Sequence, residues 1–264
     1  MSGRFTVRGL VLSERTVGDW DKSLVLLCEG IGRISVWARG AKRIKSPILA
    51  ACTLFAYADF TLLQRGDRLS VTAAEVQESF FALRRDLSGL ALATYVVELC
   101  RELCVEEQPE DTLLRMTLNA LHAIAGTSAQ LPVIKAGFEL RALSESGFQP
   151  VLEHCVRCGS AEQLHAFTPT HSGMLCANCA GDVADTFSLQ PSVLTALRHL
   201  CFAELRRIYS FRLPEQVVHE LGRICEAYTL ATLGRPIKSL SFYHDLIGLE
   251  ENPDFQPERN RGDK

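Results

Sequence analysis

The sequence predicts a multidomain α+β protein in which a five-stranded barrel precedes a helical domain, with a small cysteine-rich module inserted in that domain. Three observations support this: strand periodicity up to residue 80, helical periodicity from Ala82 onward, and two close cysteine pairs that interrupt the helical pattern. With 264 residues, the chain is long enough for one to three domains, each with its own core. We expect the barrel at 1–80, the two parts of the helical domain at 81–149 and 186–250, and the cysteine-rich module between them at 150–185. A polar, disordered tail is expected at 251–264.

Five segments near the N-terminus have the composition and alternation of strands. They are residues 5–12, 23–29, 33–39, 54–64 and 69–78. Residues 29–32 and 65–68 are short enough to connect hairpins, whereas residues 40–53 form a longer link. Five such strands in about 80 residues predict a small barrel, of which the oligonucleotide-binding (OB) fold is the common example.

The apolar period becomes helical at Ala82, which predicts a first helix up to Cys104. A second helix is expected at 111–125, closed by Gly126-Thr-Ser, and a third at 132–146, with Pro in its first turn and Gly just past its end. Helical periodicity resumes at 192–208, 214–233 and 240–249. We expect these later helices to pack on the earlier ones, because three helices alone make a thin core.

The overall composition is that of an ordinary globular protein, with a formal charge of −3 and 47% hydrophobic residues. The longest apolar runs fall short of the ~18–20 residues that span a bilayer. The first residues also lack the apolar stretch of a secretory signal. We therefore expect a cytoplasmic protein without a transmembrane helix.

Four of the ten cysteines form two tight pairs, whereas the other six stand singly in apolar stretches, as core cysteines do. The paired residues are Cys155, Cys158, Cys176 and Cys179. Two-residue gaps and a 17-residue loop let four thiolates surround one Zn²⁺, and four protein ligands make such a site structural rather than catalytic. A redox dithiol or unrelated surface cysteines are the alternatives. His154, His165 and His171 lie nearby, and we expect them at the surface.

Positive charge is concentrated in the predicted barrel. Residues 1–80 carry 11 Lys and Arg against 8 Asp and Glu, and the remaining residues carry 17 against 23. An acid-free segment after the third strand holds four cations: Arg39, Lys42, Arg43 and Lys45. These can neutralise phosphates without reading bases, which predicts a nucleic-acid surface, with a solvated loop as the alternative.

Other side chains could enlarge this surface. The candidates are the cations Arg33, Arg65 and Arg68 and the aromatic residues Trp37, Phe55, Tyr57 and Phe60. The aromatic residues could stack with bases, but alternating strand residues more often belong to a core.

The sequence contains no recognisable catalytic motif: no phosphate-binding loop with Lys-Ser/Thr, no His-Glu-x-x-His and no Gly-x-Ser-x-Gly. We therefore expect a binding protein rather than an enzyme. A translation-related RNA-binding barrel with a zinc ribbon has the same coarse architecture. A zinc-dependent nuclease or hydrolase is disfavoured by the four cysteines, which leave no open metal position.

Over residues 4–249 the chain resembles the RecO family of bacterial recombination and repair mediators. Residues 32–42, 138–148, 155–159 and 234–239 carry the resemblance. It implies an N-terminal OB-fold barrel and a helical domain with an inserted zinc module. It also implies a non-enzymatic, nucleoid-associated protein that binds single- and double-stranded DNA, anneals complementary strands coated with single-strand binding protein, and helps RecR to load RecA.

The resemblance further implies a groove in the helical domain for the acidic, apolar C-terminal tail of single-strand binding protein. Such a groove needs an apolar cleft rimmed by Lys or Arg. The candidate rim residues are Lys135, Arg141, Arg101 and Arg115. The chain departs from some relatives at Lys135-Ala-Gly, where they carry consecutive arginines, and at Leu240, where relatives often have another Arg.

Overall fold

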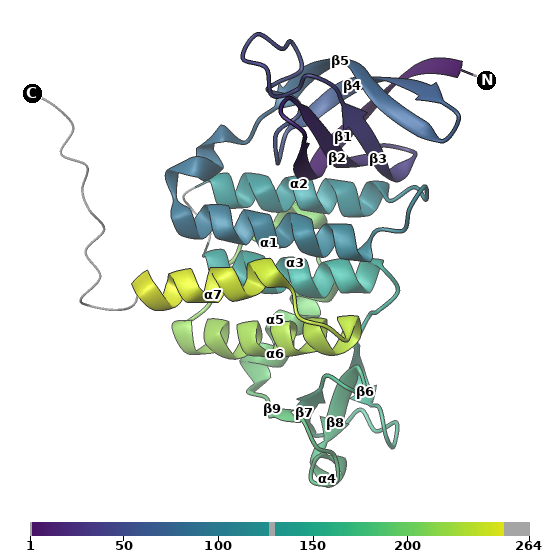
Figure 1. Cartoon of the computed structure of the whole chain (residues 1–264). Helices are drawn as coiled ribbons and strands as arrows, with labels where there is room; N and C mark the ends of the chain where they lie inside the picture. Colours follow the sequence, from purple (N-terminus) through teal and green to yellow (C-terminus); the bar gives the residue numbers. More distant parts are fainter. Residues whose placement is uncertain (1, 127–129, 251–264) are drawn as a thin grey trace, which may run out of the picture.

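A computed structural model of the chain describes residues 2–126 and 130–250. An N-terminal sheet lies at one end of the molecule, a block of helices in the middle, and a small second sheet at the other end (Figure 1). The predicted α+β class is confirmed, as are the five N-terminal strands and the helices that follow them, except that the helix expected at 192–208 ends at Phe202. The expected tail at 251–264 and most of the expected helix closure at Gly126-Thr-Ser lie outside the described residues.

The five strands of the N-terminal sheet hydrogen-bond in the order β1-β2-β3-β5-β4, and β4 returns to β1. The strands are β1 (Ser2–Val17), β2 (Asp21–Cys28), β3 (Gly32–Ala38), β4 (Tyr57–Arg65) and β5 (Arg68–Glu78). The ring of pairings is closed by one parallel pair, Trp37 with Ser70, which we call the seam. β1 is longer than predicted because its first half pairs with β4 and its second half with β2.

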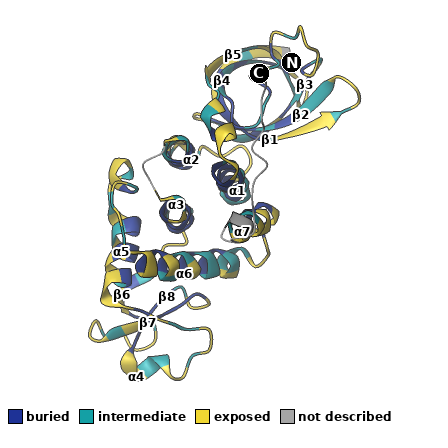
Figure 2. Cartoon of the chain, turned by 90° about the vertical axis from the view of Figure 1, so that its left-hand side faces the viewer, coloured by how far each residue is buried: buried dark blue, intermediate teal, exposed yellow. Residues whose placement is uncertain are grey.

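The helices pack in layers around α3, which is surrounded by α1, α2, α5 and α6 (Figure 2). They are α1 (Leu87–Leu103), α2 (Asp111–Ala125), α3 (Leu131–Glu145), α5 (Pro191–Phe202), α6 (Glu215–Leu233) and α7 (Lys238–Glu250), with 3₁₀ turns at Phe81–Arg85 and Leu205–Arg207. The helix expected from Ala82 begins later because the Asp86 carboxylate accepts a hydrogen bond from the Gly89 N–H at 2.7 Å. Asp86 thus caps α1 and separates it from the preceding 3₁₀ turn.

A buried charge network joins four of these helices. The Lys135 ammonium lies 2.8 Å from Glu139 Oε1 and 2.7 Å from Glu226 Oε2. The Tyr95 hydroxyl of α1 donates to Glu139 Oε1 at 2.7 Å, and His244 Nε2 of α7 lies 2.8 Å from Glu226 Oε2. Because the Lys135 and Glu139 side chains are only 5% and 0% exposed, water cannot replace these partners.

The pKa values in this network follow from burial and from the shared ammonium. Burial disfavours the charged form of Lys135, but the carboxylates of Glu139 and Glu226 outweigh it and raise the pKa of Lys135 to about 12. Burial raises the pKa of Glu139. Burial also opposes ionisation of Glu226, but Lys135 prevails and lowers the pKa of Glu226 below its ordinary value of 4.5. The stabilisation from Glu226 is therefore present above pH 4.5 and is lost as the pH falls through the lowered pKa.

The N-terminal sheet is fixed to the helices through the tip of the β2–β3 hairpin. The Gly30 N–H donates to Asp111 Oδ1 at 2.8 Å, and the Glu107 N–H donates to the Arg33 carbonyl at 3.0 Å. Gly32 has φ +91°, and a Cβ there would lie 1.8 Å from the Gln108 carbonyl oxygen. Direct backbone contact thus sets the position of the sheet on the helical block.

The second sheet lies against α5 and α6 and has the strand order β6-β8-β7-β9. Its strands are β6 (Val151–Cys155), β7 (Leu164–Thr168), β8 (Gly173–Cys176) and β9 (Phe187–Ser188), and a short helix, α4 (Ala177–Ala180), follows β8. β9 pairs with β7, so the sheet continues past the expected module end at residue 185. Within 2–126 and 130–250, the helices lack the combination of length and apolar character that a membrane crossing requires.

Replacing Lys135 by Met keeps an unbranched side chain but leaves two carboxylates without their shared cation. We expect the free energy of unfolding at pH 7 to fall by about 3–5 kcal/mol, measured by urea denaturation. The difference from wild type should shrink as the pH falls below 4.5 and through the lowered pKa of Glu226, because protonation removes the stabilisation that Glu226 gives to wild type.

The matched control is Lys238→Met, which removes an exposed lysine of α7 and should change the free energy of unfolding by less than about 0.5 kcal/mol. Equal stability of the two variants would mean that the buried network contributes little.

Candidate nucleic-acid interface and metal centre

Residues 39–45, which we call the basic loop, are held against the β1–β2 turn. Asp21 Oδ1 accepts a hydrogen bond from the Gly40 N–H at 2.8 Å, and the Lys42 N–H donates to the Trp20 carbonyl at 3.0 Å. Ala41 and Ile48 are buried in the core of the N-terminal sheet and anchor the segment from within. The backbone of the loop is thereby fixed, although its cationic side chains project outward.

The cations of the basic loop form no ion pair within residues 2–126 and 130–250. Arg39, Lys42, Arg43 and Lys45 are all exposed. Such a group of uncompensated cations on a fixed backbone can hold several phosphates of a strand.

Two shallow depressions adjoin the basic loop. The first is lined by Trp20, Arg43, Ile44 and Lys45. The second lies at the seam between β3 and β5, and Trp37, Arg65 and Arg68 help to line it. Asp21 links the two, because its Oδ2 accepts a hydrogen bond from Trp37 Nε1 at 3.3 Å while its Oδ1 holds Gly40. The structure thus brings Arg65 and Arg68 into the same region as the basic loop.

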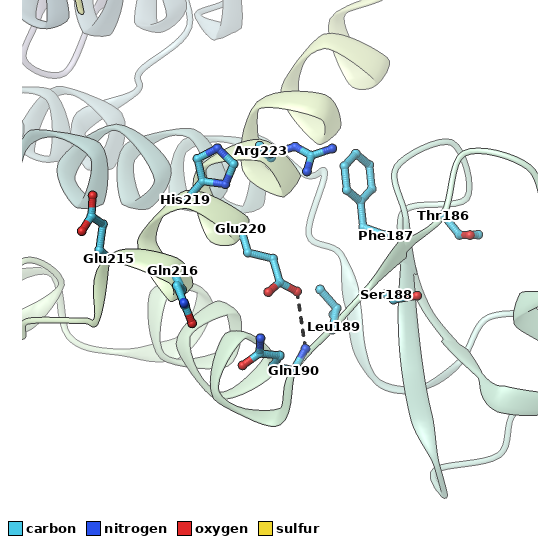
Figure 3. A pocket seen from close by; sticks show the side chains of 10 residues that line it. All are labelled: Thr186, Phe187, Ser188, Leu189, Gln190, Glu215, Gln216, His219, Glu220 and Arg223. Carbon is cyan, nitrogen blue, oxygen red and sulfur yellow. Dashed lines mark hydrogen bonds between the residues drawn. The ribbon is translucent and has the colours of Figure 1, made fainter. Parts of the chain in front are cut away.

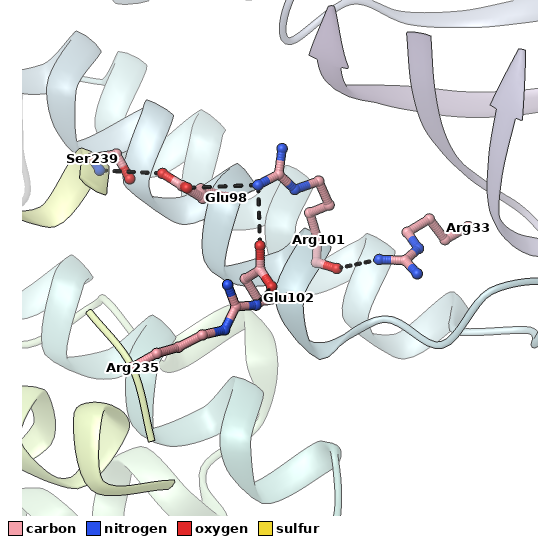
Figure 4. Close-up of polar contacts among 6 residues, drawn as sticks. All are labelled: Arg33, Glu98, Arg101, Glu102, Arg235 and Ser239. Carbon is pink, nitrogen blue, oxygen red and sulfur yellow. Dashed lines mark hydrogen bonds and ion pairs between the residues drawn. The ribbon is translucent and has the colours of Figure 1, made fainter. Parts of the chain in front are cut away.

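Arg33 does not extend this surface. Its guanidinium donates to the Arg101 carbonyl at 2.9 Å, at the junction between the N-terminal sheet and the helices (Figure 4). Arg33 lies near the tip of the β2–β3 hairpin, which packs on the helices together with Leu10 and Leu12 of β1. Its position in the sequence gives no sign of this docking contact.

Three of the four candidate stacking residues also have other roles. Phe55 and Phe60 are fully buried, and the Tyr57 hydroxyl donates to Glu29 while the ring packs on the helical core. Trp37 alone faces the surface depression at the seam.

A further aromatic side chain, Trp20, is exposed near the basic loop and was not among the predicted residues. It is 52% exposed at the end of a three-residue hairpin turn. Its exposure could have been predicted from the sequence, because a large aromatic residue directly after Gly18-Asp19 in a turn has no core to pack into.

The four paired cysteines converge at the end of the second sheet. Their Sγ atoms all lie within 4.8 Å of one another, and Cys158 and Cys176 are 3.7 Å apart. Four sulfurs around a tetrahedral Zn²⁺ at 2.3 Å would be about 3.8 Å apart, so the donor set fits such an ion. Gly159 has φ +76°, in the left-handed region that favours glycine, and its N–H donates to the Cys155 carbonyl at 2.9 Å. The cluster could hold a metal ion.

The thiols of the cluster differ in acidity. Burial opposes ionisation of Cys155, but backbone N–H groups of Cys176, Cys158 and Arg157 stabilise the thiolate and lower its pKa to about 6. Hydrogen bonding to Cys176 raises the pKa of Cys179 to about 12. A cation would compensate the crowded negative charge, so metal binding should release protons.

Three of the four cations expected at the rim of a partner-tail groove are bonded to groups within the helical domain. Lys135 is buried and neutralised by two carboxylates, and the Arg141 guanidinium is bound to Glu145 and to the carbonyls of Cys201 and Ala203. Arg101 lies between Glu98 and Glu102, a pair that also binds Ser239 and Arg235 (Figure 4). Arg115 is exposed on α2. Lys135, Arg141 and Arg101 thus bind groups of the helical domain itself, and Lys135 also lines a cavity there.

A groove lies between α6, α7 and β9, and Pro132 and Lys135 of α3 line part of it. It consists of two adjoining cavities of about 850 and 570 Å³ that share Phe187, Glu215, His219 and Arg223. The apolar floor of the smaller cavity includes Val218, Leu230 and Ile247. Arg223 lies at the groove, 5.7 Å from the centre of the Phe187 ring (Figure 3). The lining also carries three glutamates, Glu215, Glu220 and Glu226, of which Glu226 is paired with Lys135 and His244. The cleft therefore suits an apolar peptide with an acidic group placed at Arg223.

Two family models match the chain. The model described as "Recombination protein O N terminal" matches residues 1–80, and the model described as "Recombination protein O C terminal" matches residues 84–241. The first match covers the N-terminal sheet, and the second covers most of the helices and the cysteine cluster.

Curated relatives match over nearly their whole length. The chain is 34% identical to the DNA repair protein RecO of Desulforudis audaxviator over 245 residues, which are 92% of this chain and 97% of the relative. It is 33% identical to that of Symbiobacterium thermophilum over 246 residues, with the same coverage of both chains. It is 29% identical to that of Acetivibrio thermocellus over 240 residues, 90% of this chain and 95% of the relative.

Replacing Lys42, Arg43 and Lys45 together by Ala tests the basic loop. Each lost phosphate contact should reduce the slope of log K against log salt by ~0.7 for a single strand, so the slope should become shallower by about 2. Fluorescence anisotropy of a labelled oligonucleotide across a range of KCl concentrations measures this.

A triple variant with Arg84, Arg206 and Arg207 replaced by Ala lowers the net charge equally at exposed positions elsewhere. It should keep the wild-type slope. If both triple variants change the slope to the same extent, the effect is one of net charge, and the basic loop is not the binding site.

Replacing Cys155 by Ser should abolish stoichiometric metal binding and unfold residues 151–188, because a buried ligand is lost and metal binding and folding are coupled. Metal analysis of the purified protein, together with thermal unfolding, tests this. Cys201→Ala removes a buried cysteine outside the cluster and should keep the metal. Full occupancy and an unchanged melting curve in Cys155→Ser would contradict the assignment.

Proposed function

Because this chain belongs to the RecO family of DNA repair proteins, we propose that it is a mediator of recombinational repair. It binds single- and double-stranded DNA, anneals complementary strands coated with single-strand binding protein, and acts with RecR to load RecA. The observation that carries the proposal is the fixed basic loop, whose four cations form no ion pair within the described residues and lie in the region matched by the N-terminal family model.

The N-terminal sheet is the DNA-binding element in this proposal and is a barrel of the OB type. Its strand order and its surface depression at the seam support this role. The basic loop, Arg65 and Arg68 hold a strand by its phosphates. Bases that are not gripped remain free to pair with a complement, and this is the requirement for annealing.

The protein makes and breaks no covalent bond in this proposal. Zn²⁺ is its structural cofactor, held by Cys155, Cys158, Cys176 and Cys179, because four sulfur ligands leave no position for water or substrate. When bound, the ion supplies a cross-link that stabilises the second sheet. The protein acts in the cytoplasm at the nucleoid, where its DNA substrates are.

The acidic, apolar tail of single-strand binding protein occupies the groove between α6, α7 and β9. The apolar floor and the exposed Arg223 support this placement. Arg223 is the exposed cation at this groove, whereas the ammonium of Lys135, which lines the same groove, is already neutralised by two carboxylates.

An annealing assay without nucleoside triphosphates tests this function. Two complementary oligonucleotides are coated separately with single-strand binding protein and mixed, and duplex formation is followed by fluorescence energy transfer between end labels. The wild-type protein should accelerate annealing, and Arg223→Glu should do so only for naked strands, because the tail contact is needed for coated strands alone.

Arg115→Glu makes the same charge change on α2 and should behave like wild type with both kinds of strand. Failure of the folded, metal-loaded wild-type protein to accelerate either reaction would refute the annealing function. If Arg223→Glu and Arg115→Glu slow the annealing of coated strands equally, the groove is refuted as the site of the tail.

A further inference from the structure

Two large apolar side chains stand exposed beside the basic loop. Ile44, within the loop, is 92% exposed, and Trp20, in the β1–β2 turn, is 52% exposed. Together with Arg43 and Lys45 they line one surface depression. Exposing such groups to water is unfavourable, so a cluster of them marks a surface that contacts something.

The surroundings of this cluster restrict what it can contact. The Trp20 carbonyl accepts the Lys42 N–H at 3.0 Å, so the turn and the basic loop are held together at a fixed spacing. Asp21, which follows Trp20, is engaged with Gly40 and Trp37, which leaves Asp19 as the acid of the turn with an exposed carboxylate. The depression joins the apolar Trp20 and Ile44 to the cations Arg43 and Lys45. A partner that fits it must therefore combine a flat apolar face with negative charge a short distance away.

We propose that Trp20 and Ile44 form a wedge that takes up one unpaired base of a single strand whose phosphates lie on Arg43 and Lys45. An unpaired nucleotide has the required chemistry: a base with two apolar faces and an adjoining phosphate. A base inside a duplex is stacked on both sides, so the wedge selects single strands over duplexes. This inference rests on the proposed DNA-binding function and adds a base contact to its phosphate contacts.

The test compares variants of the full-length protein on a short deoxythymidine oligonucleotide and on a blunt duplex. Trp20→Ala should weaken single-strand binding by about 5- to 150-fold, the range expected for loss of one base–aromatic stack. The salt slope should stay at the wild-type value, because no phosphate contact is removed. Duplex binding should not change.

Conservative and control variants separate stacking from a folding defect. Trp20→Phe should restore single-strand affinity to within about threefold, since phenylalanine also stacks. The same variant should lose the Trp20 part of the tryptophan quenching that the oligonucleotide causes in wild type, leaving only that of Trp37. Ile44→Ser, at a site too exposed to affect folding, should weaken single-strand binding less than Trp20→Ala. Phe242→Ala removes an aromatic side chain of similar exposure, 54%, from α7 and should have no effect.

The outcomes distinguish the wedge from the proposed function. If wild type binds the oligonucleotide but Trp20→Ala binds equally well and Trp20→Phe retains the full quenching, the wedge is wrong, and this patch is open to a protein partner instead. Equal weakening of single-strand and duplex binding would also overturn the wedge. Failure of wild type to bind any DNA would overturn the proposed function itself.

Discussion

The helical domain depends on one buried ammonium placed between two carboxylates. Lys135 of α3 binds Glu139 in the same helix and Glu226 of α6, and the two carboxylates reach Tyr95 of α1 and His244 of α7. A charge buried this deeply is tolerated only while its partners stay in place, so the network specifies how four helices meet. The arrangement also explains why α3 is buried on every side although it carries a lysine and a glutamate.

The helical domain carries a β-sheet at each of its two ends. At one end, the β2–β3 hairpin fits against the α1–α2 loop so closely that Gly32 has no room for a Cβ. At the other end, β9 and α5 join the second sheet to α6, next to the groove that we assign to the partner tail. In our proposal the basic loop and the groove therefore belong to one body, and a strand and the protein that coated it can be held at the same time without a conformational change.

Much of the fold could be predicted from periodicity, because apolar spacing reflects burial directly. The strands β2 to β5 and the helices at 111–125 and 214–233 lie within a few residues of their predicted positions, whereas β1 is longer than predicted. Cysteine spacing predicted the cluster because two-residue gaps restrict geometry strongly. Lys135 and Arg33 were misplaced because a charged residue gives the same sequence signal whether it faces water or a buried partner. Trp20 was overlooked because its exposure depends on the hairpin turn, which alternation does not describe.

The central claim of this account is that the protein holds a strand by its phosphates and leaves most bases free. Permanganate oxidation of thymines in a bound oligonucleotide tests it directly, since the reagent attacks exposed, unstacked thymines. We predict that thymines in the bound strand stay as reactive as in the free strand, with protection of about one base for each bound protein, at the wedge. Protection of every thymine across the binding site would contradict the claim, because bases covered in that way could not pair with a complement.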